Sequence, residues 1–206
     1  MKVLLVNGSP HEKGCTYTAL CEIAETFKSE GIESEIFWIG NAPIGGCLGC
    51  RACYKLGKCV IDDKVNEFTA MIDSTDGFVF GSPVHYAAAS GAITSFMDRV
   101  FYSSSRRLFM KPASAIVVAR RAGTTAALDQ LQKYFSLAQM PIVPSKYWNM
   151  VHGMTPEQVK EDAEGMQNMR YLARNMAYLL KCRRAADEAG VPLPTQEDKV
   201  STNFIR

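Results

Sequence analysis

The chain has 206 residues, of which 47% are hydrophobic and 21% are charged, so it is long enough for one full domain with a substantial core and short for two. Lysine and arginine number 23 against 21 aspartates and glutamates, and the net charge of +2 excludes a strong overall field for nucleic acid or an anionic membrane surface. The expected partner is therefore a small molecule or another protein.

The first residues bear on the cellular compartment. Met1 leads directly into KVLLVNGSP, an apolar run that is too short for a spanning helix and has no cleavage-site pattern behind it. We therefore expect a cytoplasmic protein. In that reducing compartment the seven cysteines are not expected to form structural disulfides, and clustered cysteines are expected to be ligands or redox groups.

Short apolar runs predict five strands. Two runs end at Gly-Ser-Pro, KVLLVNG at 2–8 and GFVFGSP at 77–83, and ASAIVVA at 113–119 is a third run of the kind that is buried on both faces. The segment ESEIFWI at 33–39 alternates, as a strand nearer an edge would. A weaker fifth candidate is PIVPSKYW at 141–148, where Pro144 removes a donor and favours an edge or a bulge.

Helical periods lie between and after these strands. They cover 16–29, 64–73, 90–102 and 124–138. A longer amphipathic helix is predicted from Thr155-Pro156-Glu157, a good helix start, to about Ala189, with Gly190 at its end.

The alternation of strands and helices predicts the fold class. Right-handed crossovers place helices on both faces of a parallel sheet, so we expect a doubly wound α/β domain with an open parallel five-stranded sheet in three α/β/α layers. We expect residues 1–190 to form this single domain. Residues 191–206 contain two prolines and no clear period, and we expect a C-terminal tail that lies on this subunit or on a neighbour.

Three loops are expected at the carboxyl ends of the strands, where open parallel sheets bind ligands. The first, GSPHEKGCTYT at 8–18, combines glycines and hydroxyls with free N–H groups at a helix start, which suits phosphate. It lacks the Lys-Ser/Thr ending of a nucleoside-triphosphate loop and the spacing of the dinucleotide fingerprint, so a phosphate monoester fits better than ATP or NAD.

The other two loops suit a planar ring. GSPVHYAAASG at 81–91 offers backbone and flat side chains directly after a strand, and ARRAGTT at 119–125 offers amides, two arginines and a helix start. Together the three loops could hold a phosphate at one end and an aromatic heterocycle at the other. FMN has both groups.

The segments NGSPHEKGCTYTAL and GSPVHYAAASGAITSFMDR, followed by the loop at 119–125, resemble the flavodoxin-like NAD(P)H-dependent FMN reductases over roughly residues 1–150. The resemblance implies a flavodoxin-like fold and FMN. Carried over by position, it implies phosphate contacts from Ser9, His11, Cys15, Thr16 and Tyr17. It implies contacts to the isoalloxazine from Pro83, Val84, His85 and Tyr86 and from Ala119, Arg120, Arg121, Ala122, Gly123 and Thr124.

Two residues depart from the family pattern at the phosphate. His11 stands where the family often has arginine, and Cys15 stands where it often has asparagine. Both replacements weaken donors, so we expect FMN to bind less tightly than in a typical member.

Four cysteines, Cys47, Cys50, Cys53 and Cys59, lie within the segment CLGCRACYKLGKC. This close spacing lets one loop wrap a cubane cluster, although zinc also accepts four thiolates. A third interpretation has no metal and has the loop contact FMN or a dimer partner. The segment resembles the iron-sulfur flavoproteins within the same group, and that resemblance favours a 4Fe-4S cluster.

His85 is the candidate catalytic residue. At the ring edge it would donate to flavin N5 or protonate a substrate, whereas the alternative is a histidine bonded to backbone in a turn. Tyr86 either stacks on the flavin or covers the pocket. Arg120 and Arg121 either balance a reduced anionic flavin or hold the NADPH phosphate, or they are solvated surface residues.

Two further expectations concern the segment after the second loop. Asp98-Arg99 is expected to form a structural ion pair. Apolar residues around Phe96, Phe101, Tyr102 and Phe109 are expected to be exposed at a subunit interface, and the resemblance implies a homodimer or homotetramer.

These observations predict an FMN-dependent oxidoreductase. It would pass electrons from NAD(P)H or a reduced ferredoxin-like donor through FMN to a quinone, flavin, nitro or azo compound, or oxygen, with a cluster as a single-electron relay. The alternative is a flavodoxin-like electron carrier without a small-molecule substrate, which the net charge of +2 disfavours because flavodoxins are usually acidic. A metal-stabilised binding module without a redox role is a third possibility.

Overall fold

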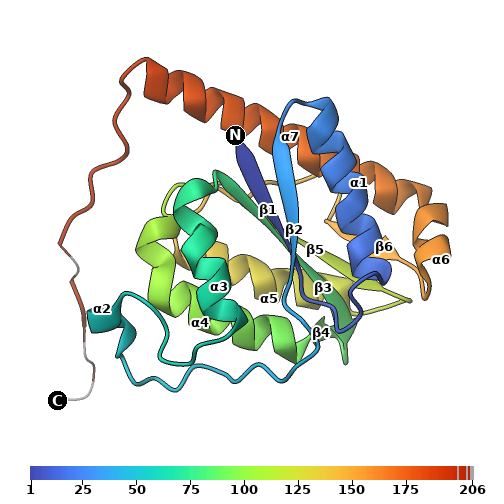
Figure 1. Ribbon diagram of the computed structural model, residues 1–206. Helices are drawn as coiled ribbons and strands as arrows, with labels where there is room; N and C mark the ends of the chain where they lie inside the picture. Colours follow the sequence, from blue (N-terminus) through green and yellow to red (C-terminus); the bar gives the residue numbers. More distant parts are fainter. Residues whose placement is uncertain (199, 203, 205–206) are drawn as a thin grey trace.

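A parallel sheet with helices on both faces forms the centre of the computed structural model, which describes residues 1–198, 200–202 and 204 (Figure 1). Its parallel strands stand in the order β2-β1-β3-β5-β6. In chain order they are β1 (Lys2–Asn7), β2 (Glu33–Trp38), β3 (Gly77–His85), β5 (Ala113–Ala119) and β6 (Met150–His152). The order reverses between β1 and β3, so the loops after these two strands flank the point where doubly wound sheets bind ligands.

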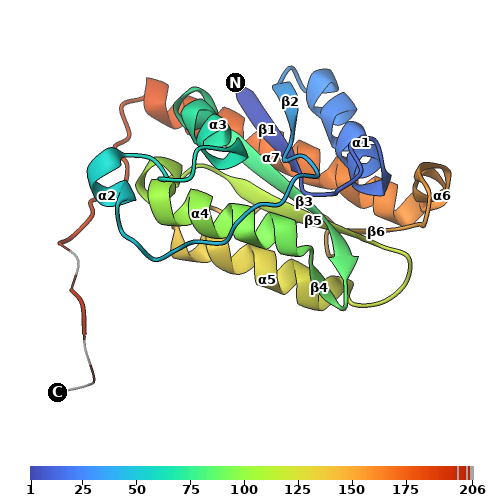
Figure 2. The ribbon, with the colours of Figure 1, turned by 60° about the horizontal axis from the view of Figure 1, so that its bottom comes forward.

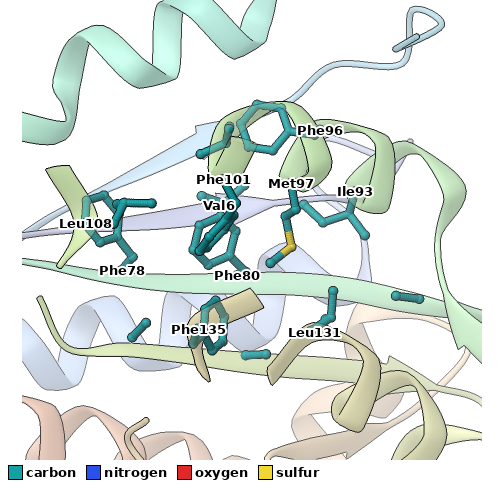
Figure 3. Close-up of a cluster of buried hydrophobic side chains, with 14 of the residues drawn as sticks. Val6, Phe78, Phe80, Ile93, Phe96, Met97, Phe101, Leu108, Leu131 and Phe135 are labelled. Carbon is teal, nitrogen blue, oxygen red and sulfur yellow. The ribbon is translucent and has the colours of Figure 1, made fainter. Parts of the chain in front are cut away.

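Alternation of side chains along the strands divides the core into two layers. Val6 and Phe80 point to one face of the sheet, where they join the first core cluster (Figure 3), and Leu5 and Val79 point to the other face. The helices of the first face are α3 (Lys64–Met71), α4 (Gly91–Leu108) and α5 (Thr124–Leu137), and those of the second are α1 (Cys15–Ser29), α6 (Pro156–Glu161) and α7 (Ala163–Glu188). The predicted three-layer α/β/α fold is confirmed.

The edges of the sheet agree with the sequence at one side and differ at the other. The strand predicted at 33–39 is the edge strand β2, as its alternation indicated. The strand predicted at 141–148 is wrong, because the opposite edge is β6 at Met150–His152. The earlier segment contributes one isolated bridge through Ile142. Pro144 lacks the N–H that a continued ladder would need.

The long helix predicted from 155 to 189 is also wrong as a single element. It is divided into α6 and α7 at Asp162, whose ψ of 80° is not helical. The Asp162 carboxylate accepts from the N–H of Gly165 at 2.9 Å and from the N–H of His152 at 2.7 Å. One side chain therefore caps α7 and ties it to β6, and this double use requires the break.

A sixth, two-residue strand that the sequence does not signal follows β3. It is β4 (Ala88–Ala89), which pairs antiparallel with the end of β3. At the tip of this hairpin, Tyr86 and Ala87 have φ angles of +50° and +60°. Turns of this kind usually carry Asn-Gly, and each residue with a Cβ costs roughly 1–2 kcal/mol there. Such strain is typical of sites whose surroundings hold the backbone for function.

Beyond α7, the described residues form neither helix nor strand and run away from the sheet (Figures 1 and 2). Gln196 makes a side-chain hydrogen bond with Gln139 at 3.0 Å. Residues 199, 203 and 205–206 of the predicted tail lie outside the described residues, and the domain boundary at 190 stays a prediction. Within the described part of the chain, every helix is too short or too polar to cross a membrane.

Candidate functional site

The loop after β1, residues 8–14, is held in shape by its own polar groups. The N–H of Ser9 donates to Asn7 Oδ1 at 3.1 Å, and the N–H of His11 donates to Ser9 Oγ at 3.1 Å. From the edge strand, Trp38 Nε1 donates to the carbonyl of Ser9 at 2.8 Å. The loop is therefore shaped before any ligand binds.

The N-terminus of α1 lies directly behind this loop and is open to an anion. Gly14, its N-cap residue, has no side chain to cap the first turn, and that turn holds no acidic residue. Thr16 is 1% exposed, and its buried Oγ1 has no hydrogen-bond partner among the residues that the structure describes. A buried unsatisfied hydroxyl costs roughly 1–3 kcal/mol. A hydroxyl of this kind beside free N–H groups fits a phosphate acceptor.

Three consecutive residues predicted at the phosphate, Cys15, Thr16 and Tyr17, have different surroundings. Burial raises the pKa of the Cys15 thiol, so Cys15 adds no negative charge beside a phosphate at neutral pH. Tyr17 instead lines a hollow of about 390 Å³ between α1 and β2, together with Glu12 and Trp38. Thr16 faces β3, because its Cγ2 would lie 2.8 Å from a Cβ at Gly81. The helix thus turns consecutive side chains toward different neighbours.

The second loop is locked to the first through the start of α4. The N–H of Gly8 donates to the carbonyl of Gly81 at 2.8 Å, and Ser90 Oγ donates to the carbonyl of Gly8 at 3.0 Å. The N–H of Ser90 in turn donates to Ser82 Oγ at 3.0 Å. Ser90 is also the N-cap residue of α4, since its Oγ accepts from the N–H of Ile93. Sequence reasoning missed these positioning residues, whose partners lie far along the chain.

The third loop lies against the tip of the second. Gly123 has a φ of +90°, and a Cβ built there would stand 2.6 Å from Ala87 Cα and 3.1 Å from Val84 Cγ1. Only glycine permits this close approach. Thr124, which begins α5, is buried, and Arg120, Arg121 and Ala122 before it are exposed. The structure therefore brings all three predicted loops to one continuous edge (Figure 2).

The exposure of the candidate ring-binding residues increases with their distance from the sheet. Pro83 and Val84 are half-buried, and Pro83 stands in register with Val118 of β5. His85, at the end of β3, is exposed, and Tyr86 is fully exposed at the turn. The side chains of His85 and Tyr86 are thus accessible to a ligand. Their assignment to the flavin stays a prediction.

The four clustered cysteines lie in the long connection between β2 and α3, whose one helix is α2 (Cys53–Leu56). All four line one hollow beside α4, with Arg99 and Tyr102 on the helix side, and the described residues that line it include no carboxylate or imidazole. Among the described residues, no three Cys, His, Asp or Glu side chains converge closely enough to share a single metal ion. Thiolates of a cubane each bind a different iron and stand farther apart. An all-sulfur donor set around one hollow fits such a cluster better than a preformed zinc site.

The surroundings of the hollow favour the protonated thiol at one of the four cysteines. Burial raises the pKa of the Cys53 thiol, and the neighbouring Cys47, Cys50 and Cys59 raise that pKa further. Binding of a metal through the Cys53 thiolate therefore displaces a proton.

Two expectations about α4 are wrong. Arg99 pairs with Asp63 rather than with Asp98, whose carboxylate accepts from the Tyr134 hydroxyl. Neighbouring residues of a helix point about 100° apart, so Asp98 and Arg99 face different elements. Phe96 and Phe101 are buried in the core cluster (Figure 3), although Tyr102 is exposed.

Comparison with known proteins places these observations in a family. The family model described as NADPH-dependent FMN reductase matches residues 1–155. An iron-sulfur flavoprotein of Methanocaldococcus jannaschii is 29% identical over 189 residues, which cover 88% of this chain and 98% of that relative.

Two solved structures show the same fold. RosB with the bound intermediate 8-demethyl-8-formylriboflavin-5'-phosphate superposes with a TM-score of 0.71 at 15% identity, covering 100% of this chain and 94% of RosB. A flavodoxin from the domain Archaea superposes with a TM-score of 0.58 at 15% identity, covering 88% of this chain and 99% of the flavodoxin. The family model spans most of the chain, including all three loops, and the chain therefore belongs to the NADPH-dependent FMN reductase family of FMN-binding, flavodoxin-like oxidoreductases.

Proposed function

We propose that this protein passes electrons from NAD(P)H, or from a reduced ferredoxin-like donor, through FMN to a quinone, a flavin, a nitro or azo compound, or oxygen. One observation carries the proposal, the buried hydroxyl of Thr16 at the open N-terminus of α1. In this position the hydroxyl lacks an acceptor that a phosphate monoester would supply.

In this proposal the phosphate end is held by the first loop and the start of α1. The free N–H groups at Cys15 and Thr16 and the Thr16 hydroxyl donate to phosphate oxygens, and Ser9 and His11 shape the loop. His11 is exposed, and an imidazole lacks the fork of donors with which arginine binds phosphate, so it binds phosphate less strongly than an arginine would. Tyr17 closes the site on the side of the edge strand.

The second and third loops hold the ring. Bound FMN would supply the redox chemistry, namely the capacity to take up a hydride from a nicotinamide. Pro83 and Val84 present backbone to the ring edge, and His85 holds a proton near N5. Tyr86 covers the ring face. From the third loop, the amides of Ala119, Ala122, Gly123 and Thr124 and the side chains of Arg120 and Arg121 offset negative charge on the reduced ring or hold the NADPH phosphate.

The four cysteines, in this proposal, carry a 4Fe-4S cluster that exchanges single electrons with the flavin. The donor chemistry of the hollow and the likeness to an iron-sulfur flavoprotein support it. Arg51, Lys55 and Lys58 belong to the same segment and offset the negative charge of a thiolate-bound cluster. The cytoplasmic location and the homodimer or homotetramer stay predictions.

The first test is a cofactor assay on protein purified without oxygen. We expect a flavin spectrum, about one FMN per chain, and about four irons and four acid-labile sulfides. Cys50→Ala should lose the iron and sulfide and keep FMN. Cys182→Ala is the matched control, because Cys182 is an exposed cysteine on α7, and it should keep both cofactors.

The outcomes separate the parts of the proposal. Flavin without iron would leave an FMN reductase whose cysteines line an interface, and protein without flavin would refute the main proposal. The electron-carrier alternative predicts no NAD(P)H oxidation with quinones, flavins or nitro compounds until a partner protein is added. Steady-state oxidation of NADH and NADPH, monitored at their absorbance band, distinguishes these cases.

A further inference from the structure

Arg99 is a buried cation in the middle of α4. It is 1% exposed, and its volume exceeds that of the other fully buried side chains described. A guanidinium taken out of water is unfavourable unless its charge is paired and its donors are bonded. The partners of Arg99 therefore reveal why it is there.

All five N–H groups of this guanidinium find acceptors. Nη1 and Nη2 bond the two oxygens of Asp63 at 2.6 Å and 2.9 Å, in a bidentate pair. The remaining Nη groups donate to the carbonyls of Gly45 at 3.4 Å and Ile61 at 2.8 Å, on both sides of the cysteine segment. The last donor, Nε, bonds Cys59 Sγ at 3.2 Å. An arginine whose guanidinium lay in water could donate to solvent and would not need a hydrogen bond to sulfur.

Cys59 is fixed from a second side as well. The amide of Asn66, on α3, accepts from the N–H of Cys59 at 3.1 Å and donates to its carbonyl at 3.0 Å. Two helices therefore hold this cysteine, one by its backbone and one by its sulfur. By contrast, Cys47 and Cys50 are exposed. One of the four sulfurs is thus anchored, and at least two lie on an open loop.

The same helix also reaches the flavin-binding loops. α4 begins after Ser90, which is bonded to the first loop through Gly8, and Arg99 follows nine residues later. At the rise of an α-helix this separation is on the order of 14 Å. One rigid element therefore holds both the phosphate loop and the sulfur of Cys59.

We propose that Arg99 is the positioning residue of the iron-sulfur centre: it fixes Cys59 as the anchored ligand and, through its N–H bond to sulfur and its charge, raises the reduction potential of the cluster. This inference rests on the cluster in the proposed function. Reduction adds negative charge to a thiolate-bound cluster. A donor and a cation beside one sulfur stabilise that charge, which makes the cluster easier to reduce.

The decisive variant is R99M/D63N, which removes both charges of the pair. Neither partner is then left as a lone buried charge, and asparagine still caps α3 where Asp63 now accepts from the N–H of Val65. The control is R107Q. Arg107, which is also on α4, makes a bidentate pair with Asp73 at 2.9 Å and 2.8 Å, and among the described residues its guanidinium donates to no cysteine.

The measurement is an anaerobic redox titration of reconstituted protein, followed by the visible and electron paramagnetic resonance signals of the cluster. At the wild-type midpoint, R99M/D63N should hold about tenfold less reduced cluster relative to oxidised, which for a one-electron couple is a shift of about 59 mV to more negative potential. R107Q should titrate with the wild type. D63N alone keeps the arginine and should not lower the potential.

Each alternative outcome has a separate meaning. A full cluster with unchanged potential in R99M/D63N would leave Arg99 a purely structural residue and overturn the inference. If that variant does not fold by circular dichroism, R99K decides: it keeps the charge but not the planar donor set, so a lowered potential is expected and an unchanged one overturns the inference. Wild-type protein with FMN but no iron would refute the cluster and this inference together and leave the flavin proposal standing.

Discussion

Thr16 and Thr26 are two buried threonines on the same helix, and only one of their hydroxyls has a hydrogen-bond partner among the described residues. Thr26 Oγ1 donates to the carbonyl of Glu22 at 2.9 Å, whereas Thr16 Oγ1 has no partner among the described residues. The difference matters because a hydroxyl reserved for a ligand contributes to binding rather than to folding. The two positions therefore form a natural pair for substitution by isosteric valine.

Thr16→Val should weaken FMN binding about tenfold or more, close to 1.5 kcal/mol, because a hydrogen bond to the charged phosphate is lost. The apoprotein should be as stable as the wild type or more so. Thr26→Val should leave FMN affinity unchanged and lower stability by about 1 kcal/mol. Fluorescence titration with FMN and urea unfolding of the apoprotein measure both quantities. Equal FMN affinities for the two variants would remove Thr16 from the phosphate site.

For single residues, the sequence predicts which residue types a loop offers better than it predicts where their side chains point. The sequence could name Ser9 and Thr16 as phosphate candidates because small hydroxyl residues after a buried strand suit phosphate, and this assignment stays a prediction. The hollow beyond Tyr17 and the bond from Trp38 could not be named in this way, because they depend on where β2 lies relative to α1. Asn7 carries a weak signal, as a polar residue that ends an otherwise apolar strand.

Among the elements, the break between α6 and α7 shows how a tertiary contact overrides a helical period. The amphipathic pattern predicts one helix through 155–189, but Asp162 caps α7 and anchors the N–H of His152 at the same time. A continuous helix would leave that N–H without its carboxylate partner. The hairpin of β3 and β4 is a similar case, because its tip uses Tyr86 and Ala87 in place of the usual turn residues.

Asp162→Ala removes both of these hydrogen bonds. We expect the free energy of unfolding to fall by about 2 kcal/mol, with roughly 1 kcal/mol from the lost cap and the rest from the unpaired N–H. Asp162→Asn keeps an oxygen for the cap and should lose less than half as much. Urea unfolding followed by circular dichroism provides the comparison. Equal losses in the two variants would argue that charge, rather than hydrogen bonding, holds the break.

For the whole molecule, the order of strands and helices along the chain was enough to predict the fold. Apolar runs that stop at Gly-Ser-Pro and the helical periods between them specify a parallel sheet, because crossovers have one hand. The packing of loops against one another was not predictable in this way. Gly123 and Ala87 lie 36 residues apart, and nothing local in either segment signals their contact.

Gly123→Ala tests whether the three loops act as one site. The added Cβ would meet Ala87 and Val84, so the second and third loops must separate. Gly31→Ala is the matched control, since Gly31 has a φ of +74° but open space around its Cα. Both variants should lose about 1–2 kcal/mol of stability from the left-handed backbone, and Gly123→Ala should lose roughly 1–3 kcal/mol more from the clash.

FMN affinity should separate the two glycine variants further. It should fall in Gly123→Ala and hold in Gly31→Ala, as measured by fluorescence titration at a temperature where both proteins are folded. An unchanged affinity in Gly123→Ala would show that the third loop binds no part of the flavin. That result would also remove Arg120 and Arg121 from the proposed ring site.

The cysteine segment lies in the connection between β2 and α3, and the two buried clusters are built almost wholly by residues outside it. The entropy cost of closing a loop grows only slowly with its length, so the exposed stretch around Cys47 and Cys50 can change in length with little effect on folding, whereas Cys59 is held by the buried Arg99. In the proposed function, two of the four ligands could therefore be exchanged or respaced by changes in an exposed loop, while the helix that carries Arg99 keeps Cys59 in place.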